Sequence, residues 1–291
     1  MLFKGSIVAI VTPFARGKVD HTALAGLVRW HLAEGTHGIV VNGTTGEAPT
    51  LAAEEQEATI RTVVRAAGGR LPVIAGVGTN DTAKTVAQAK RAAALGADGL
   101  LVVTPYYNRP VQEGCARHFE LVARAVKKPV IVYHIPGRTA VTLTVETVER
   151  LMACTNIVAI KEASGDLRFA MDLRTRIGAR LAVLSGEDPL NLPLAAVGSC
   201  GTISVVANVV PRQMARMYER IFSNDFASAA GIHLDLLDLH RTLFIETNPI
   251  PVKAALAMMG RIAPEIRLPM TWLPPDKQKT LRAVLKRHRL L

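Results

Sequence analysis

Residues 130–161 read VIVYHIPGRTAVTLTVETVERLMACTNIVAIK. Two short runs rich in valine and isoleucine, Val130–His134 and Ile157–Glu162, lie near the two ends of this segment. Such near-continuous apolar runs are typical of strands buried on both faces of a parallel sheet. Between them, Thr144–Ala153 has apolar residues at helical spacing. The segment therefore predicts a strand–helix–strand unit, from which α/β folds are built.

The same alternation extends along the chain in both directions. The expected strands are Ser6–Thr12, Gly38–Val41, Pro72–Gly76, Gly99–Val103, Val130–His134, Ile157–Glu162, Ala182–Ser185 and Cys200–Ser204. The expected helices are Thr22–Glu34, Ala52–Ala67, Thr82–Leu95, Glu113–Val126, Thr144–Ala153, Leu167–Ile177, Asp188–Val197 and Pro211–Phe222. Eight such units predict an α/β fold of the (β/α)8 (TIM) barrel type. An open doubly wound sheet is the alternative, because a sequence does not show the order of its strands.

Residues 223–291 follow the eighth unit and read as further helices, interrupted at Asn248-Pro249 and Pro274-Pro275. We therefore expect two regions: a barrel over residues 1–222 that carries the active site, and a C-terminal helical region over residues 223–291. In (β/α)8 barrels, catalytic groups lie where strands end and the following loops begin. The functional residues are expected at those strand ends.

The composition limits the classes of protein. Hydrophobic residues make up 49% of the 291 residues, but no apolar run approaches the ~20 residues needed to span a bilayer. Met1–Phe14 reads as the beginning of a first strand and not as a signal peptide. The cysteines Cys115, Cys154 and Cys200 are odd in number and widely spaced, which indicates neither a disulfide framework nor a metal site. We expect a cytoplasmic protein without membrane contact, metal or cofactor.

The formal net charge of +11 raises the question of nucleic acid. The densest basic stretch, residues 277–289, alternates with apolar residues at helical spacing. It therefore predicts a terminal helix with a solvated basic face. No recognition motif accompanies it, and aromatic residues for base stacking make up only 4% of the chain. We expect no nucleic-acid partner, and the charge favours anionic substrates through long-range steering.

Two strand ends carry residues suited to catalysis. Lys161 closes the sixth expected strand, Asn156-Ile-Val-Ala-Ile-Lys161. Apolar surroundings at the barrel mouth disfavour its charged form and favour a neutral amine that attacks a carbonyl. The plain alternative is a lysine paired with Glu162. The second strand ends in Asn42-Gly-Thr-Thr-Gly-Glu47, which could hold a small carboxylate through hydroxyl and N–H groups, or simply form a tight turn.

The next candidates follow the fourth and fifth strands. Tyr106 and Tyr107 are adjacent on a proline-bounded loop, so one phenol could reach a site while the other packs at an interface. Tyr133 lies at the end of the fifth strand and Arg138 a few residues later. Arginine suits bidentate capture of a carboxylate, although a solvated arginine would read the same way. Gly76-Val-Gly78 lacks the third glycine of a dinucleotide fingerprint, so we expect no NAD.

Several ordered motifs in the chain resemble those of the 4-hydroxy-tetrahydrodipicolinate synthase (dihydrodipicolinate synthase) family. They are Gly5-Ser-Ile-Val-Ala-Ile-Val-Thr-Pro13, Gly43-Thr-Thr-Gly-Glu47, Val103-Thr-Pro-Tyr-Tyr-Asn-Arg-Pro110, Ile160-Lys-Glu-Ala163, Leu184-Ser-Gly186 and Asn248-Pro-Ile-Pro-Val-Lys253. The resemblance covers nearly the whole chain. It implies a (β/α)8 barrel with a C-terminal helical region that joins pyruvate to aspartate-4-semialdehyde on the route to diaminopimelate and lysine.

The resemblance also implies catalytic roles. Lys161 matches the lysine that forms a Schiff base with the ketone of pyruvate. Tyr133 matches the phenol that moves protons beside this lysine, and Thr44 and Tyr107 match its partners in a hydroxyl relay. In the family, that second tyrosine comes from a neighbouring subunit, so a full site needs an intact dimer. The resemblance implies a homotetramer built as a dimer of dimers, although dimers also occur in the family.

The remaining matched positions bind substrates. Thr45 matches a ligand of the pyruvate carboxylate, and Arg138 matches the group that binds the carboxylate of the semialdehyde. Gly186 and Ile203 match positions that line the pyruvate pocket. Sugar-acid lyases of the same superfamily, such as N-acetylneuraminate lyase, share the lysine and the tyrosine but resemble the chain less at Arg138.

A regulatory site departs from the family pattern. Asn80 and Tyr106 match a lysine-inhibition site found in many bacterial members, but Lys84 stands where lysine-sensitive members carry an acid. Ala53 and Gln56 replace histidines found in some of them. Because a cationic side chain repels an ammonium group, we expect weak or absent inhibition by lysine.

Two other functions are left open by the sequence. One is a pyruvate-dependent lyase of another substrate class, a 2-keto-3-deoxy sugar-acid or N-acetylneuraminate aldolase that uses the same lysine. The other is an inactive barrel kept as a binding protein, which salt-sensitive nucleic-acid binding would reveal.

Overall fold

The computed structural model describes residues 3–291. Eight parallel strands form a closed barrel in the order β1-β10-β9-β8-β7-β6-β5-β4. They are β1 (Gly5–Ala9), β4 (Gly38–Val41), β5 (Val73–Gly76), β6 (Gly99–Val103), β7 (Val130–His134), β8 (Ile157–Glu162), β9 (Ala182–Ser185) and β10 (Gly201–Ser204). Each barrel strand pairs with the barrel strands next to it along the chain, and the last strand, β10, pairs with the first, β1, to close the ring. The barrel prediction is confirmed, and the open sheet is excluded.

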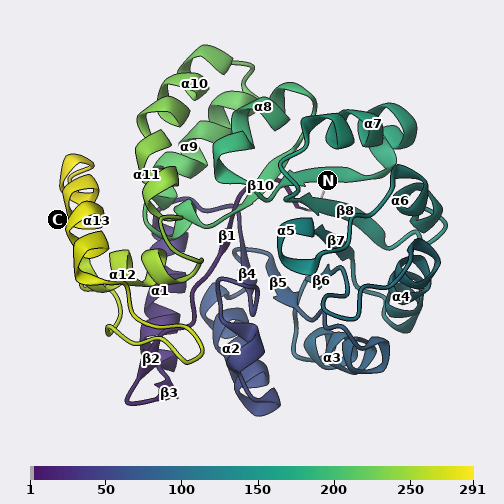
Figure 1. Cartoon of the computed structure of the whole chain (residues 1–291), viewed down its shortest axis with the longest axis horizontal. Coiled ribbons are helices and arrows are strands. Elements are labelled where there is room, and N and C mark those ends of the chain that lie inside the picture. The colour runs from purple at the N-terminus through teal and green to yellow at the C-terminus, as the bar shows by residue number, and fades with distance from the viewer. Residues whose placement is uncertain (1–2) are drawn as a thin grey trace.

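Helices surround the barrel (Figure 1). They are α1 (His21–Ala33), α2 (Ala53–Ala67), α3 (Thr82–Ala94), α4 (Gln112–Ala125), α5 (Pro136–Thr139), α6 (Val145–Leu151), α7 (Leu167–Ile177), α8 (Asn191–Ala196) and α9 (Pro211–Phe222). Four 3-10 turns are η1 (Ala48–Thr50), η2 (Gly178–Arg180), η3 (Asp188–Leu190) and η4 (Val206–Asn208). Most observed bounds lie within one or two residues of the expected ones.

Several local features differ from the sequence prediction, including the short helix α5, which was not expected. Strand β1 ends at Ala9 and not at Thr12, because the Val11 N–H donates to the Asn208 side chain at 3.2 Å instead of to a neighbouring strand. A small antiparallel hairpin, β2 (Phe14–Ala15) and β3 (Lys18–Val19), follows it and was not expected. The single helix expected at 188–197 is η3 followed by α8; the Asp188 carboxylate there accepts the N–H groups of residues 205 and 206, at 2.9 Å each.

The C-terminal region is helical, as expected. It contains α10 (Phe226–Asp235), α11 (Leu237–Thr242), α12 (Ile250–Met258) and α13 (Pro275–Arg287). Helix α10 packs against α9, and α13 packs against α11 and α12, so these helices gather on one side of the barrel (Figure 1). None of the helices within residues 3–291 combines the length and apolar character needed to cross a membrane.

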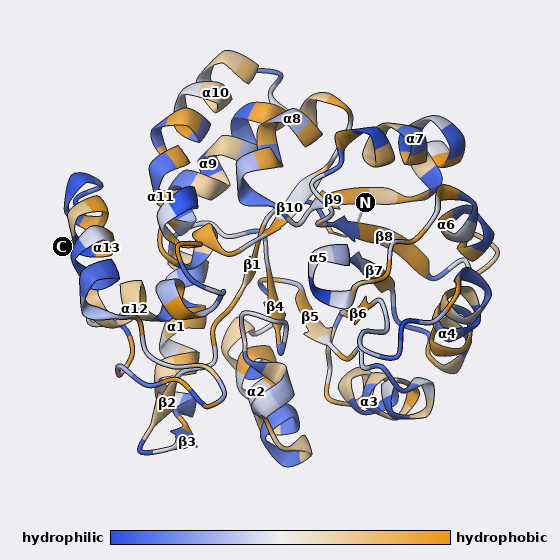
Figure 2. Ribbon diagram, in the orientation of Figure 1, coloured by the Kyte–Doolittle hydropathy of each residue, from blue (hydrophilic) through white to orange (hydrophobic). Residues whose placement is uncertain are grey.

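Two apolar clusters follow from the alternation of side chains along each strand. One fills the barrel interior and contains Ile131 and Tyr133 of β7. The other lies between the strands and the helices and contains Val130 and Val132 of the same strand. Figure 2 shows the strands in hydrophobic colours and the outer faces of many surrounding helices in hydrophilic ones. A polar residue at an inward-facing position of a strand therefore lies inside the barrel.

Candidate active site

Lys161 and Tyr133 lie side by side inside the barrel. They occupy paired positions on the adjacent strands β8 and β7. The Lys161 Nζ lies 4.1 Å from the centroid of the Tyr133 ring, and the two residues are 6% and 5% exposed. The amine therefore lies over the face of the phenol ring, in a part of the barrel that is largely closed to solvent.

The residues that follow them point the opposite way and support both strands. His134 and Glu162 are fully buried, with His134 Nδ1 3.5 Å from Glu162 Oε1. The His134 ring packs 4.7 Å from the ring of Phe169 on α7, and its Nε2 accepts the Leu143 N–H at 3.2 Å. The alternative in which Lys161 pairs with Glu162 is therefore not the one adopted. The sequence analysis gave no role to His134.

The loop after β4 carries Thr44 and Thr45 and turns sharply. Thr45 is buried, and its Oγ1 accepts a hydrogen bond from the Asn248 side chain at 3.0 Å. Gly76 at the end of β5 lets this loop approach, because a Cβ there would lie 2.1 Å from the carbonyl oxygen of Asn42. Gly76 therefore serves close packing of the backbone. It belongs to the segment Gly76-Val-Gly78, for which we expected no dinucleotide site.

A buried ion pair holds the end of the same loop. Glu47 has a φ of 54° and is 3% exposed, and its Oε1 lies 2.5 Å from Nζ of Lys253, which is fully buried on α12. The Glu47 Oε2 accepts the Arg267 N–H at 3.1 Å. Burial lowers the pKa of Lys253, and Glu47 opposes that shift by stabilising the ammonium form. The C-terminal region is thus anchored to the loop that carries the two threonines.

Arg138 lies on the short helix α5, which follows β7 directly. Its Nη2 donates a hydrogen bond to the backbone oxygen of Asn248 at 3.1 Å. Asn248 therefore contacts both Arg138 and Thr45, the two residues expected to bind carboxylates. Sequence reasoning noted Asn248-Pro249 only as a helix interruption and within a family motif, and gave it no site role.

A cavity of about 680 Å³ opens at this end of the barrel. Six of the expected site residues line it: Thr44, Thr45, Tyr133, Arg138, Lys161 and Gly186. A Cβ on Gly186 would lie 3.0 Å from Cε of Lys161 and 2.6 Å from Cβ of Ala163, so glycine keeps the space beside the amine open. The wall also contains residues to which the sequence analysis gave no role, namely Ser164, Glu187, Val205, Phe244, Glu246, Thr247 and Asn248.

Two expected site residues lie elsewhere. Ile203 is fully buried on β10 in the apolar cluster of the barrel interior and does not line the cavity. Tyr107 is 89% exposed, with a φ of 71°, and is also absent from the cavity wall. A tyrosine displayed in this way fits the expectation that it serves a neighbouring subunit.

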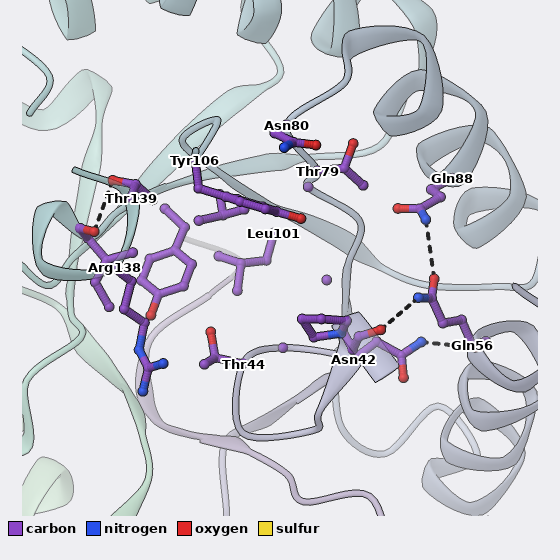
Figure 3. A pocket seen from close by; sticks show the side chains of 18 of the residues that line it. Asn42, Thr44, Gln56, Thr79, Asn80, Gln88, Leu101, Tyr106, Arg138 and Thr139 are labelled. Atoms are coloured by element: carbon purple, nitrogen blue, oxygen red, sulfur yellow. Dashed lines mark hydrogen bonds between the residues drawn. The ribbon is translucent and has the colours of Figure 1, made fainter. Parts of the chain in front are cut away.

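A second cavity of about 420 Å³ shares Thr44, Tyr133 and Arg138 with the first. It contains the three residues expected at a regulatory site: Asn80 and Tyr106, which Figure 3 shows, and Lys84. Gln56 and Gln88 also line it, and their side chains are hydrogen-bonded at 3.4 Å. Lys84 and Arg138 are the charged side chains of its lining, so the cavity is cationic.

The described part of the chain offers no cluster of three or more His, Cys, Asp or Glu side chains suited to a metal ion. The chemistry available at the site therefore comes from a buried amine, two threonines, a phenol, an arginine and the carboxyl groups of the wall. Such a set can form a covalent adduct with a ketone and bind carboxylates.

Comparison with known proteins identifies the family. The chain matches the model of the dihydrodipicolinate synthetase family over residues 2–288. It is 47% identical over 290 residues to the 4-hydroxy-tetrahydrodipicolinate synthase of Pelobacter propionicus, and 48% identical over 291 residues to that of Pseudomonas aeruginosa, with 100% of each chain covered in both cases. The crystal structure of dihydrodipicolinate synthase from Aquifex aeolicus superposes with a TM-score of 0.98 at 47% identity, covering 99% of both chains. The chain belongs to the dihydrodipicolinate synthetase family.

Proposed function

We propose that the protein is a 4-hydroxy-tetrahydrodipicolinate synthase, a Schiff-base-forming lyase of lysine and diaminopimelate biosynthesis that condenses pyruvate with aspartate-4-semialdehyde. The observation that carries the proposal is the position of Lys161, buried beside Tyr133 in a cavity that also contains Thr45 and Arg138. The names of relatives at 45–48% identity support this activity over that of a sugar-acid aldolase.

The first half of the reaction follows from the amine and the phenol. The amine nitrogen of Lys161 attacks the ketone carbon of pyruvate, and loss of water gives an iminium. The iminium withdraws electrons, so the methyl group of pyruvate loses a proton and becomes an enamine. We assign the movement of these protons to Tyr133, whose ring lies beside the amine, and Thr44 lines the same cavity. The enamine carbon then attacks the aldehyde carbon of the second substrate.

The decisive assay couples turnover of pyruvate with aspartate-4-semialdehyde to a reductase that consumes the product. We expect steady-state turnover, together with an adduct on Lys161 when pyruvate is trapped with borohydride. A trapped adduct without turnover would move the assignment to a lyase of another substrate class. Absence of both would contradict the Schiff-base chemistry itself.

Arg138→Ala is expected to lower kcat/KM for the semialdehyde by on the order of a hundredfold, since a charge-assisted hydrogen bond to a carboxylate contributes about 1.5–3 kcal/mol. The rate of pyruvate trapping on Lys161 should remain close to that of the parent. Arg168→Ala removes an exposed arginine of α7 that lies outside the cavity wall and serves as the matched control. Equal losses of pyruvate trapping and of semialdehyde turnover would contradict a role specific to the second substrate.

L-lysine at sub-millimolar concentration is expected to inhibit the enzyme weakly or not at all. The charged side chains of the second cavity are both cationic, and an ammonium group entering it would meet no carboxylate. Lys84→Glu places an acid at the same position and should strengthen inhibition by L-lysine. Strong inhibition of the parent enzyme in a steady-state assay would show the expectation to be wrong.

A homotetramer remains our proposal for the assembly. It is supported by Tyr107, which lies on the protein surface and would complete the hydroxyl relay of Tyr133 and Thr44 only in another subunit. The family also contains a relative described as a monomeric variant, 41% identical to this chain with a TM-score of 0.98. Sedimentation of the purified protein measures the assembly directly.

A cytoplasmic location likewise remains a proposal, supported by three cysteines that are free in the described structure.

A further inference from the structure

Glu187 stands out among the residues that line the large cavity. It follows Gly186 directly, and hydrogen bonds hold the backbone here. The Gly186 N–H donates to the backbone carbonyl oxygen of Glu162 at 2.6 Å, and the Ser185 hydroxyl donates to the backbone carbonyl oxygen of Glu187 at 3.0 Å. Its carboxyl group has no hydrogen bond or ion pair to any other side chain or backbone group within residues 3–291. The loop is thus held firmly while the carboxyl group is left available to a ligand.

The other acid on the same wall differs in this respect. Glu246 forms an ion pair with Lys277, which lowers the pKa of its carboxyl group. Burial raises the pKa of Glu187 instead, with further repulsion from Asp188, while Lys161 and Arg138 act in the opposite direction. Glu187 is therefore a stronger base than an ordinary carboxylate, in the electrostatic field of both the nucleophile and the arginine.

The second substrate, aspartate-4-semialdehyde, has a positively charged ammonium group beside its carboxylate. The carboxylate can bind Arg138, but the ammonium group has no partner among the residues described so far. Apart from Glu187, the charged groups of the wall are the cations Lys161 and Arg138 and the acid Glu246, which is already paired with Lys277. Moreover, the nitrogen must lose a proton before it can attack the Schiff-base carbon and release Lys161. A free carboxylate near Arg138 would satisfy both needs.

We propose that the carboxylate of Glu187 binds the ammonium group of the amino-aldehyde substrate and accepts its proton, which enables the ring closure that releases Lys161. In this step one N–H bond breaks and one O–H bond forms, and the electron pair remains on nitrogen as the nucleophile. Ring closure then forms a bond from this nitrogen to the Schiff-base carbon. A second proton passes from the nitrogen to Nζ of Lys161 as the bond between that carbon and Nζ breaks, so Lys161 leaves as an amine. This inference rests on the proposed synthase function. It makes Glu187 a catalytic residue for ring closure, and not for formation of the carbon–carbon bond.

Glu187→Gln tests the assignment with little change in shape. We expect steady-state turnover with aspartate-4-semialdehyde to fall about a hundredfold, as for the loss of a general base. Because carbon–carbon bond formation continues, borohydride should trap the complete two-substrate adduct on Lys161, which mass spectrometry distinguishes from the pyruvate adduct. The fall in kcat at acid pH, where Glu187 becomes protonated, should also disappear in this variant.

Two comparisons separate this role from a structural one. Succinate semialdehyde has no amino group, so its adduct should form on Lys161 at the same rate in the parent and in Glu187→Gln. Glu54→Gln alters an exposed acid of α2 outside the cavity wall and should leave both turnover and the adduct pattern unchanged. Parent-like turnover of Glu187→Gln, or equal loss of adduct formation with both aldehydes, would overturn the inference. If the parent itself formed no pyruvate adduct, the synthase function would fail instead.

Discussion

Lys161→Arg should reduce turnover by more than about a thousandfold, the scale found when a covalent nucleophile is removed. The guanidinium fills much of the same space beside the Tyr133 ring but has no free electron pair to attack a ketone. Only the covalent route is removed, while most of the side-chain volume remains. The measurement is kcat/KM in the coupled assay, together with borohydride trapping of pyruvate and mapping of the modified peptide.

Lys253→Arg is not a suitable comparison, because that lysine is buried in an ion pair. Lys90→Arg, at an exposed position of α3, provides the control and should retain both turnover and trapping on Lys161. A trapped adduct at another lysine in the Lys161→Arg variant, with turnover preserved, would show that the nucleophile has been assigned to the wrong strand.

Lys253→Met is expected to have the largest effect on stability. It leaves the Glu47 carboxylate buried without its cation, and loss of one partner of a buried ion pair costs about 3–5 kcal/mol. For a chain of this size, that corresponds to a fall in Tm of roughly 10 °C. Since Glu47 ends the loop that carries Thr44 and Thr45, activity should decline at temperatures below the new Tm. Thermal unfolding followed by circular dichroism gives the shift.

The double variant Glu47→Gln with Lys253→Met distinguishes two contributions to the loss of stability. One is the loss of the attraction between the two charges, and the other is the burial of a carboxylate without its cation. Replacing both partners removes the uncompensated carboxylate, so Tm should recover in part relative to Lys253→Met alone. Lys277→Met breaks a more exposed ion pair, with Glu246, and should change stability by about 0–1 kcal/mol. A Tm for Lys253→Met equal to that of Lys277→Met would show that the buried pair contributes little.

The sequence predicted the parts of the site that depend on local pattern. Alternation along Ile157–Glu162 places Lys161 in the barrel, and the same alternation places Tyr133 on the neighbouring strand. Strand ends converge in a barrel, so the threonine loop and Arg138 could be expected nearby. The fold was predicted from the repeated strand–helix pattern, because each strand and each helix can be recognised from its own stretch of sequence.

The missed residues depend on contacts between distant segments. Asn248 reaches Thr45 across 203 positions, and Lys253 reaches Glu47 across 206, so no periodic pattern connects either pair. Glu187 has an ordinary sequence context, and only the structure shows that it lines the cavity while its carboxyl group has no partner within residues 3–291. Likewise, the apolar pattern of residues 188–197 does not show that Asp188 accepts backbone N–H groups from the loop after β10. Where Asp188 makes this contact, the single expected helix is divided into η3 and α8.

Asn248 has a consequence for the order in which the enzyme becomes active during synthesis. The ribosome completes all eight strands before it reaches this residue, yet the supports of Thr45 and Arg138 come from it. All eight strands have therefore been synthesised while both of these supports are still missing. We expect catalytic competence only once the segment that carries Asn248 has left the ribosome and docked, so a chain cut short after the eighth strand should be inactive.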